Sequence, residues 1–342
     1  EIRSENIGDG PAYDIVITDD VVGPEVSATG AVAITILNGS GTPITPTVAP
    51  SFSFDGAGAL EVIVPELLAD HEVVITYDAV VQDGVLFSST LTNTASVARY
   101  DSNPDGDTIN PPADPEAEER VYSGPSDTAD VTTPDVSLSK EYLSSSDANT
   151  ADPSGGDNAE LNIGEEVTYE LTITVPQGSA DIVLTDDLPP GLLAQSAEVV
   201  SIGGASDLSS TLTAGDTDTS SSAITINTNR DQVTFDFGTI TIDGTNDAAA
   251  TNTTIVVRIT SIVEDIVGLD AGDMLTNTAT VAVSDPSTGD PLQADVTDTE
   301  TVDIVEPELE LLKSGPVVPT RAMWLITQLR LQIPVRGLPM MQ

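Results

Sequence analysis

A short acidic segment is the first part of this chain whose residue types could do chemistry. Residues 101–107 run Asp-Ser-Asn-Pro-Asp-Gly-Asp, with oxygen-bearing side chains at alternate positions and a glycine that permits a tight turn. This spacing is typical of the start of a calcium loop, but a proline occupies the position of the closing glutamate, which excludes an EF-hand. A looser calcium site and a solvated acidic loop both remain open. The candidate ligands are Asp101, Asn103, Asp105 and Asp107.

Residues suited to enzymatic turnover are missing from the sequence. Asp186 and Asp187 form a carboxylate pair, but neighbouring residues of a strand point to opposite faces and cannot share a substrate. The chain has one histidine, no cysteine, no Gly-rich phosphate loop, and too few aromatic residues (4%) for a sugar-stacking cleft. We therefore expect a protein that is not an enzyme and requires no cofactor, with calcium as the one candidate ion.

Three other polar residues stand at positions that the alternating pattern otherwise fills with apolar residues. Lys140 and Asp186 each end a segment with an apolar residue at every second position, and Asn277 lies within a third such segment. An ammonium, a carboxylate and an amide are costly to bury unless they meet. The alternation therefore predicts that these three side chains contact one another in the core.

The elements that must position these residues are β-strands. Apolar and polar residues alternate with a period of two in many segments, and turn-rich Pro, Gly, Asn and Asp clusters separate these segments. Clear examples are 60–64, 167–175, 233–237 and 255–259. No segment shows the spacing of an amphipathic helix. We predict an all-β fold of tandem immunoglobulin-like antiparallel β-sandwich domains.

Two motifs occur twice and define the domains. DIVITDD at 14–20 returns as DIVLTDD at 181–187, and LTNTASVA at 91–98 returns as LTNTATVA at 275–282. The period is about 170 residues, which is typical of an array of domains that serves as a spacer or scaffold.

The predicted domains follow from this period and from the repeated Pro-led starts. They are an N-terminally truncated repeat at 1–133, a complete repeat at 134–305 and the start of a third at 306–342. Both lysines of the chain, Lys140 and Lys313, occupy the same position of the repeat.

An ordered set of motifs in the complete repeat resembles a known family. The set comprises Lys140 at the end of the first strand, G-x-x-V-x-Y at 164–169, T-D-x-L-P at 185–189 and L-T-N-T-A-T-V at 275–281. It resembles the bacterial surface repeats called domain of unknown function eleven and the related fimbrial isopeptide-forming domains. The resemblance covers the complete repeat and most of the first one.

The resemblance implies a covalent role for the inward polar residues. In the isopeptide-forming relatives, a first-strand lysine condenses with a last-strand asparagine beside a buried acid, which corresponds to Lys140, Asn277 and Asp186 here. An apolar site favours the neutral amine and the protonated acid that this reaction needs. The alternative is a triad that is only hydrogen-bonded.

Charge restricts the partners. The chain has 56 acidic and 10 basic residues and a net charge of −46, so it repels nucleic acid and anionic membrane surfaces. No apolar run is long enough to insert into a membrane. The expected partners are neighbouring repeats of the same chain and an unidentified surface ligand.

The C-terminal tail differs from the rest of the chain. Residues 321–342 contain no acid, the only tryptophan and three of the four methionines, in place of the strand that the repeat demands. A shift of reading frame would explain this change, and we expect these residues to be out-of-frame or disordered. A short basic amphipathic tail that binds a membrane or a partner is the alternative.

Two functions fit the sequence. The first is a non-enzymatic extracellular stalk or spacer in a large bacterial surface or secreted protein, with an intramolecular Lys-Asn isopeptide crosslink. The second is a calcium-dependent adhesion or ligand-binding module that uses the acidic loop. Both place the chain outside the cell or at its surface.

Overall fold

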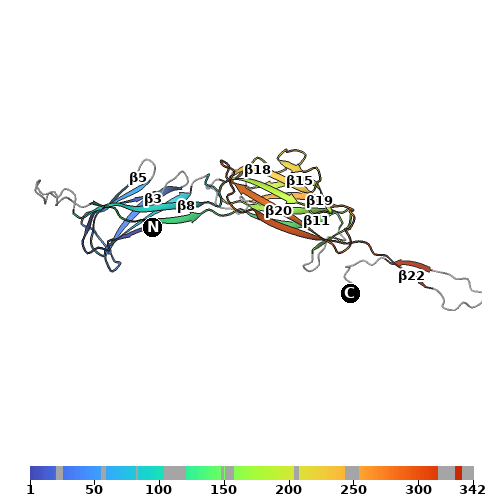
Figure 1. Cartoon of the computed structure of the whole chain (residues 1–342), viewed down its shortest axis with the longest axis horizontal. Coiled ribbons are helices and arrows are strands. Elements are labelled where there is room, and N and C mark those ends of the chain that lie inside the picture. The colour runs from blue at the N-terminus through green and yellow to red at the C-terminus, as the bar shows by residue number, and fades with distance from the viewer. Residues whose placement is uncertain are drawn as a thin grey trace, which may run out of the picture.

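The protein consists of two β-sandwiches arranged end to end (Figure 1). The computed structural model describes residues 1–20, 26–54, 59–81, 84–103, 121–147, 150, 158–203, 208–242, 254–314 and 328–332. In these ranges the chain forms strands and turns without a helix, and hence without a helix that could cross a membrane. The predicted all-β sandwich fold is confirmed.

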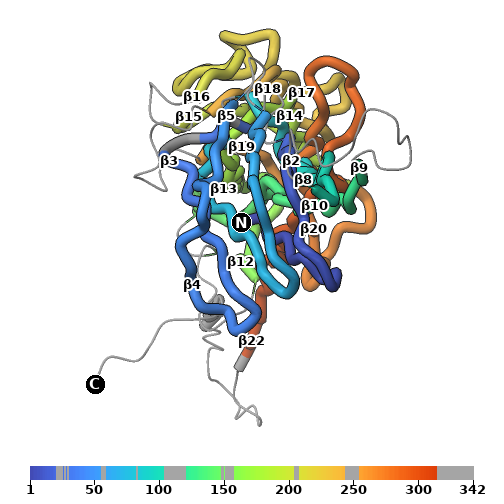
Figure 2. The backbone as a smooth tube through the Cα atoms, turned by 90° about the vertical axis from the view of Figure 1, so that its left-hand side faces the viewer, coloured from blue at the N-terminus to red at the C-terminus, as the bar shows by residue number. Residues whose placement is uncertain are grey.

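The first sandwich packs one smaller sheet against one larger sheet. The smaller sheet has the order β1 (Ile2–Glu5), β7 (Glu72–Val81), β3 (Val26–Leu37) and β4 (Pro43–Ile44). The larger sheet has the order β10 (Ser126–Thr132), β8 (Thr90–Asp101), β2 (Ala12–Asp19), β6 (Leu60–Leu67) and β5 (Ser51–Phe54). A short strand, β9 (Val121–Tyr122), also pairs with β8. In Figure 2 this sandwich faces the viewer, with β3 and β4 on one side and β2, β8 and β10 on the other.

The second sandwich repeats this arrangement and adds strands. Its smaller sheet has the order β11 (Ser137–Ser145), β13 (Glu166–Thr174), β19 (Thr254–Val263) and β15 (Leu192–Ile202). Its larger sheet contains β12 (Ala159–Leu161), β21 (Val296–Ile304), β20 (Met274–Ser284), β14 (Gly178–Asp187), β18 (Gln232–Ile242), β16 (Leu208–Ser209) and β17 (Ile224–Ile226). Among the described ladders, β12–β21 is parallel and the others are antiparallel.

Alternation of side chains builds the core of the second sandwich. In β13 the inward residues, from Val167 to Ile173, are fully buried, while the residues between them are partly exposed. Strands β14 and β19 follow the same pattern. Because each sheet buries one face, the two apolar faces pack together and the polar faces meet water.

The two sandwiches share a set of equivalent strands. The repeated motifs align β2 with β14 and β8 with β20, and the sheet orders then align β1 with β13, β7 with β19 and β10 with β21. Strand β11 has no counterpart among the described residues of the first sandwich. Strand β1 is consequently the edge of its sheet, whereas β13 is covered by β11.

Beyond the second sandwich the chain forms a two-stranded ribbon. Strand β22 (Glu310–Ser314) pairs antiparallel with β23 (Gln328–Gln332). Strand β23 is the part of the tail 321–342 that the structure describes; the rest of the tail lies outside the described residues.

The junction between the sandwiches is formed by the loop that joins β7 to β8. Phe87 of this loop is fully buried and belongs to the apolar core of the second sandwich. The Ser179 amide donates a 2.7 Å hydrogen bond to the Val85 carbonyl, and the Ser88 amide donates one of 3.2 Å to the Pro134 carbonyl. Thus the first sandwich inserts an aromatic side chain into its neighbour and fixes it with backbone hydrogen bonds.

A glycine makes this close approach possible. Gly178 has a φ of +128°, a conformation that side-chain-bearing residues rarely adopt. A Cβ atom at this position would lie 2.3 Å from the Val85 carbonyl oxygen. Any larger residue would therefore push the Val85–Phe87 segment out of its site.

Replacing Phe87 with alanine tests this junction. We expect Phe87→Ala to destabilise the second sandwich by about 3–5 kcal/mol, because truncation of a buried aromatic side chain leaves a cavity. Hydrogen exchange of the β14 and β18 amides, followed by mass spectrometry, measures this change. The matched control is Phe52→Ala, since Phe52 lies in the first sandwich and is 47% exposed. Equal protection of β14 in both variants would contradict the proposed packing.

Candidate functional site

The second sandwich holds a lysine, an aspartate and an asparagine in contact within its core. The Lys140 ammonium donates a 2.7 Å hydrogen bond to Asp186 Oδ1 and forms a fully buried ion pair with it. The Asn277 amide nitrogen lies 3.3 Å from Asp186 Oδ2. The exposed fractions of the three residues are 3%, 0% and 0%. The structure thus brings together the three residues that the alternation placed inward.

The cluster joins the two sheets of the sandwich. Lys140 lies on β11 of the smaller sheet, while Asp186 and Asn277 lie on β14 and β20 of the larger sheet. The Lys140 backbone amide also donates a 2.7 Å hydrogen bond to Asp298 Oδ2 on β21. A bond between Lys140 and Asn277 would therefore connect the first strand of one sheet to a central strand of the other.

The surroundings of the cluster favour the uncharged forms of the lysine and the acid. Burial lowers the pKa of Lys140 and raises the pKa of Asp186, and the attraction between the two charges only partly opposes these shifts. The ammonium lies 4.9 Å from the centre of the Tyr169 ring, whose own pKa is raised by burial. Transfer of one proton from Lys140 to Asp186 would leave a neutral amine beside a neutral carboxylic acid.

Several polar atoms in this core lack hydrogen-bond partners. They are Asn277 Oδ1, the Tyr142 and Tyr169 hydroxyls and Ser261 Oγ. An unsatisfied buried carbonyl oxygen costs free energy. The Asn277 carbonyl oxygen is therefore available to accept a hydrogen bond during a reaction of the amide.

The equivalent site of the first sandwich has the acid and the amide without a lysine. Asp19 is 1% exposed and accepts a 2.5 Å hydrogen bond from the Tyr77 hydroxyl, which also lies 3.4 Å from the Asn93 amide nitrogen. Oxygen Oδ1 of Asp19 and Oδ1 of Asn93 have no hydrogen-bond partner. Burial raises the pKa of Asp19, and its hydrogen bond from Tyr77 only partly opposes this shift.

The proposed calcium ligands are only partly described. Asp101 is fully buried at the end of β8, and both of its carboxylate oxygens accept hydrogen bonds from Arg99. Asn103, two residues further along the chain, is exposed. Asp105 and Asp107 lie outside the described residues. Calcium binding by this loop stays a prediction.

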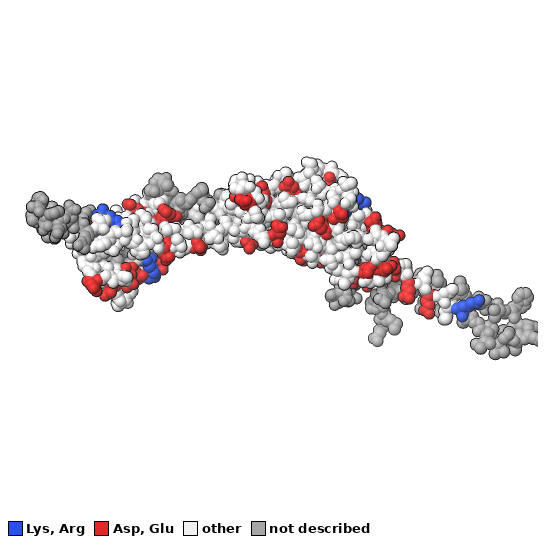
Figure 3. Space-filling model, in the orientation of Figure 1, with Lys and Arg blue, Asp and Glu red and all other residues white. Residues whose placement is uncertain are grey.

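Acidic side chains are numerous on the face of the molecule that Figure 3 shows. In Figure 3 they occur along both sandwiches on the face shown, with few basic side chains between them. Within the described ranges, no three His, Cys, Asp or Glu side chains are placed to hold a metal ion.

Three contributors to these sites were not predicted from the sequence. Asp298 anchors the backbone of Lys140, Tyr169 covers its ammonium, and Gln293 holds the start of β11 through both backbone groups of Val136. The alternation of apolar and polar residues in 167–175 already indicates that Tyr169 points inward, two residues after Val167. Asp298 and Gln293 belong to polar segments that carry no such signal.

Replacing Asp19 with asparagine tests the unpaired acid. Since its folded pKa lies above the unfolded value, Asp19 stabilises the fold fully below about pH 4 and loses this contribution as the pH rises through the folded pKa. We expect Asp19→Asn to raise the unfolding free energy at pH 7 by roughly 1 kcal/mol or more and to flatten its fall above pH 4.

Denaturant unfolding at a series of pH values measures this effect. The matched control, Asp20→Asn, removes the same charge from the adjacent exposed residue. If Asp19→Asn and Asp20→Asn change the unfolding free energy equally at every pH, burial of Asp19 does not destabilise the fold.

No protein family matches the chain, and no curated protein matches it. Similar solved structures include the C-terminal domain of the AgI/II polypeptide BspA from Streptococcus agalactiae, at 13% identity and a TM-score of 0.33, covering 88% of this chain and 90% of that chain.

Two pilin structures are similar to the same extent. A 35 kDa C-terminal fragment of the major pilin GBS80 of S. agalactiae has 15% identity and a TM-score of 0.33, covering 53% of this chain and 62% of that chain. The major pilin subunit BcpA of Bacillus cereus has 13% identity and a TM-score of 0.31, covering 89% of this chain and 77% of that chain. These structures are bacterial surface and pilin-type β domains. Similarity at this level says nothing about the activity of this chain, whose fold is established by its own strand pairing.

Proposed function

We propose that this chain is a structural repeat of a bacterial surface or secreted protein, which spaces or projects other parts of that protein outside the cell. Its membership of the domain of unknown function eleven repeats belongs to this proposal. The observation that carries it is the buried contact of Lys140, Asp186 and Asn277 across the two sheets. A cluster with no access to solvent suits a crosslink and is closed to a substrate.

The proposed reaction condenses the Lys140 amine with the Asn277 side-chain amide. After proton transfer to Asp186, the amine lone pair attacks Cγ of Asn277, and the protonated acid donates a hydrogen bond to the amide oxygen. This donation needs a half-turn of the amide about its Cβ–Cγ bond, which exchanges the two similar atoms Oδ1 and Nδ2. The new C–N bond forms, the old one breaks, and the amide nitrogen leaves as ammonia.

The crosslink would stabilise the repeat by restricting its unfolded state. It would close a loop from β11 to β20 that contains most of the second sandwich. The chain-entropy relation for crosslinks gives about 5 kcal/mol for a loop of this length. Such a gain suits an extracellular spacer that has no cysteine for disulfides.

Mass spectrometry of the intact protein tests the crosslink. We expect the chain to be lighter than its sequence by one ammonia, and digestion to give a branched peptide that joins Lys140 to Asn277. Asp186→Asn should abolish this loss, because asparagine cannot shuttle the proton, and should lower the melting temperature.

The matched control is Asp187→Asn, which removes a charge from the adjacent exposed residue and should leave the crosslink intact. A wild-type chain with the full sequence mass would refute the reaction. If Asp186→Asn fails to fold, Lys140→Arg provides a second variant that keeps the charge and cannot form this bond.

A further inference from the structure

The outer edge of β11 in the second sandwich is held by side chains and not by a further strand. On one side β11 pairs with β13, and no strand of the described ranges pairs with its other side. Because the backbone amides of a strand point alternately to its two sides, the amides of Lys140 and Tyr142 face the same edge. Amides at an unpaired edge need other partners when they are removed from water. The larger sheet supplies these partners.

Two carboxylates of β21 accept the amides at this edge. The Lys140 amide donates a 2.7 Å hydrogen bond to Asp298 Oδ2, and the Tyr142 amide donates one to the Glu300 carboxylate. The two acids are two residues apart and therefore share one face of β21, whereas Thr299 between them is exposed on the other face. The acids of β21 thus have the same spacing as the amides of β11 that they bind.

Asp298 belongs to a row of three residues that crosses the larger sheet. Ala279 of β20 is opposite Asp186 of β14 on one side and opposite Asp298 of β21 on the other. Directly opposite residues share a face of the sheet, so all three lie on the face that packs against the smaller sheet. Neighbouring strands are about 5 Å apart, which places the two aspartates roughly 10 Å apart across the sheet. The methyl group of Ala279 leaves the space between them open.

Lys140 connects these two aspartates across Ala279. Its backbone amide is bound by Asp298 and its ammonium by Asp186, each at 2.7 Å. A lysine side chain is flexible, so an ion pair at its tip does not by itself fix the strand that carries it. Here the larger sheet fixes both the backbone and the amine of Lys140. Asn277 lies two residues before Ala279 on the same face, which places its amide beside the amine.

The negative charges of the two acids on β21 do not favour the proposed reaction. Asp298 and Glu300 both raise the pKa of Lys140 against the larger effect of burial, and so favour its ammonium form. The attack on the Asn277 amide needs the neutral amine. A contribution of these acids to the reaction therefore has to come from their hydrogen bonds to the backbone of β11.

We propose that Asp298, assisted by Glu300, is a positioning residue for the Lys140–Asn277 crosslink. By binding the outer edge of β11, it keeps the Lys140 amine within reach of the Asn277 side-chain carbon. Small displacements of reacting groups lower reaction rates strongly, so a strand that moves at this edge slows the condensation. This role rests on the crosslink proposed above, whereas the hold of Asp298 on β11 does not, and the two are measured separately.

The rate of ammonia loss distinguishes positioning from an effect of charge. The full chain is made by cell-free synthesis, sampled into denaturant over time and measured by intact mass. We expect Asp298→Ala to slow the loss about tenfold or more, because a hydrogen bond to a charged group is removed. Asp298→Asn keeps an oxygen for the Lys140 amide and should react at the wild-type rate or faster, since it removes a charge that favours the ammonium.

The matched control is Asp295→Ala, which removes the charge of an exposed acid just before β21 and should react like the wild type. Equal slowing by Asp298→Ala and Asp298→Asn would assign the effect to charge and overturn the proposal.

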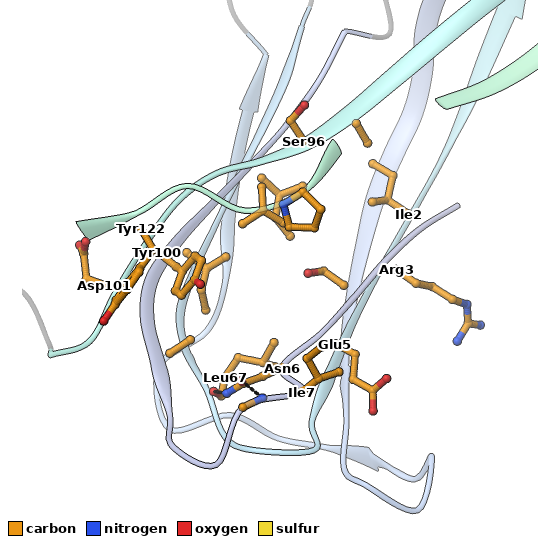
Figure 4. A pocket seen from close by; sticks show the side chains of 18 of the residues that line it. Ile2, Arg3, Glu5, Asn6, Ile7, Leu67, Ser96, Tyr100, Asp101 and Tyr122 are labelled. Atoms are coloured by element: carbon orange, nitrogen blue, oxygen red, sulfur yellow. Dashed lines mark hydrogen bonds between the residues drawn. The ribbon is translucent and has the colours of Figure 1, made fainter. Parts of the chain in front are cut away.

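Amine labelling measures the hold on β11 in a chain that cannot form the crosslink. In Asn277→Ala the Lys140 amine is free but enclosed, since its side chain has no exposed surface. The cavity of about 670 Å³ that Figure 4 shows beside Tyr100 and Tyr122 is lined by residues of the first sandwich and does not reach Lys140. An amine-reactive reagent therefore modifies Lys140 only when β11 moves, whereas the exposed Lys313 is an internal reference.

In this Asn277→Ala background we expect Asp298→Ala to raise the labelling rate of Lys140 relative to Lys313 about tenfold or more. Asp298→Asn and Asp295→Ala should leave this ratio unchanged. If Asp298→Ala fails to fold, Glu300→Ala provides a second variant, which removes the neighbouring hydrogen bond and should raise the ratio by less.

The outcomes for the crosslink and for the positioning role are distinguishable. A wild-type chain that never loses ammonia refutes the crosslink and with it the positioning role, while the labelling still shows whether Asp298 holds β11. A wild-type chain that loses ammonia no faster than Asp298→Ala refutes the positioning role alone. Lys140 labelling that neither Asp298→Ala nor Glu300→Ala raises would show that these acids do not hold the strand.

Discussion

A lysine ammonium and an aspartate carboxylate cannot be buried in this core unless they meet, and this constraint fixes the arrangement of the second sandwich. Lys140 and Asp186 come from different sheets, so their pairing sets the position of β11 against β14. A shift of one residue in either strand would turn one charge to the solvent and leave the other buried alone. The apolar alternation of the strands and the polar cluster thus require the same register.

The two sandwiches differ around this polar cluster. With β11 in place, the second sandwich encloses a continuous core whose central side chains are fully buried. Among the described residues, the first sandwich has a smaller buried apolar cluster, β1 at the edge of its sheet, and an Asp19 oxygen without a hydrogen-bond partner.

Much of this arrangement could be predicted from alternation and repetition. The period of two predicted the strands. It also predicted that Lys140, Asp186 and Asn277 point inward, and the structure places these three residues in contact. The crosslink itself stays a prediction, since contact is a condition for the reaction and not its product. Phe87 could not be assigned, because it lies in a short loop, and only the packed structure shows that a loop of one domain completes the core of the next. The acidic loop is mostly outside the described residues.

The insertion of Phe87 gives the assembly of this chain an order in time. The second sandwich takes part of its core from residues that leave the ribosome before any of its own strands. Because domains fold in turn from the N-terminus during synthesis, Phe87 is already available when β14 and β18 emerge. A repeat made in isolation would have no such residue to fill the site beside Gly178. Each domain of such an array would thus serve as a folding template for the one that follows it.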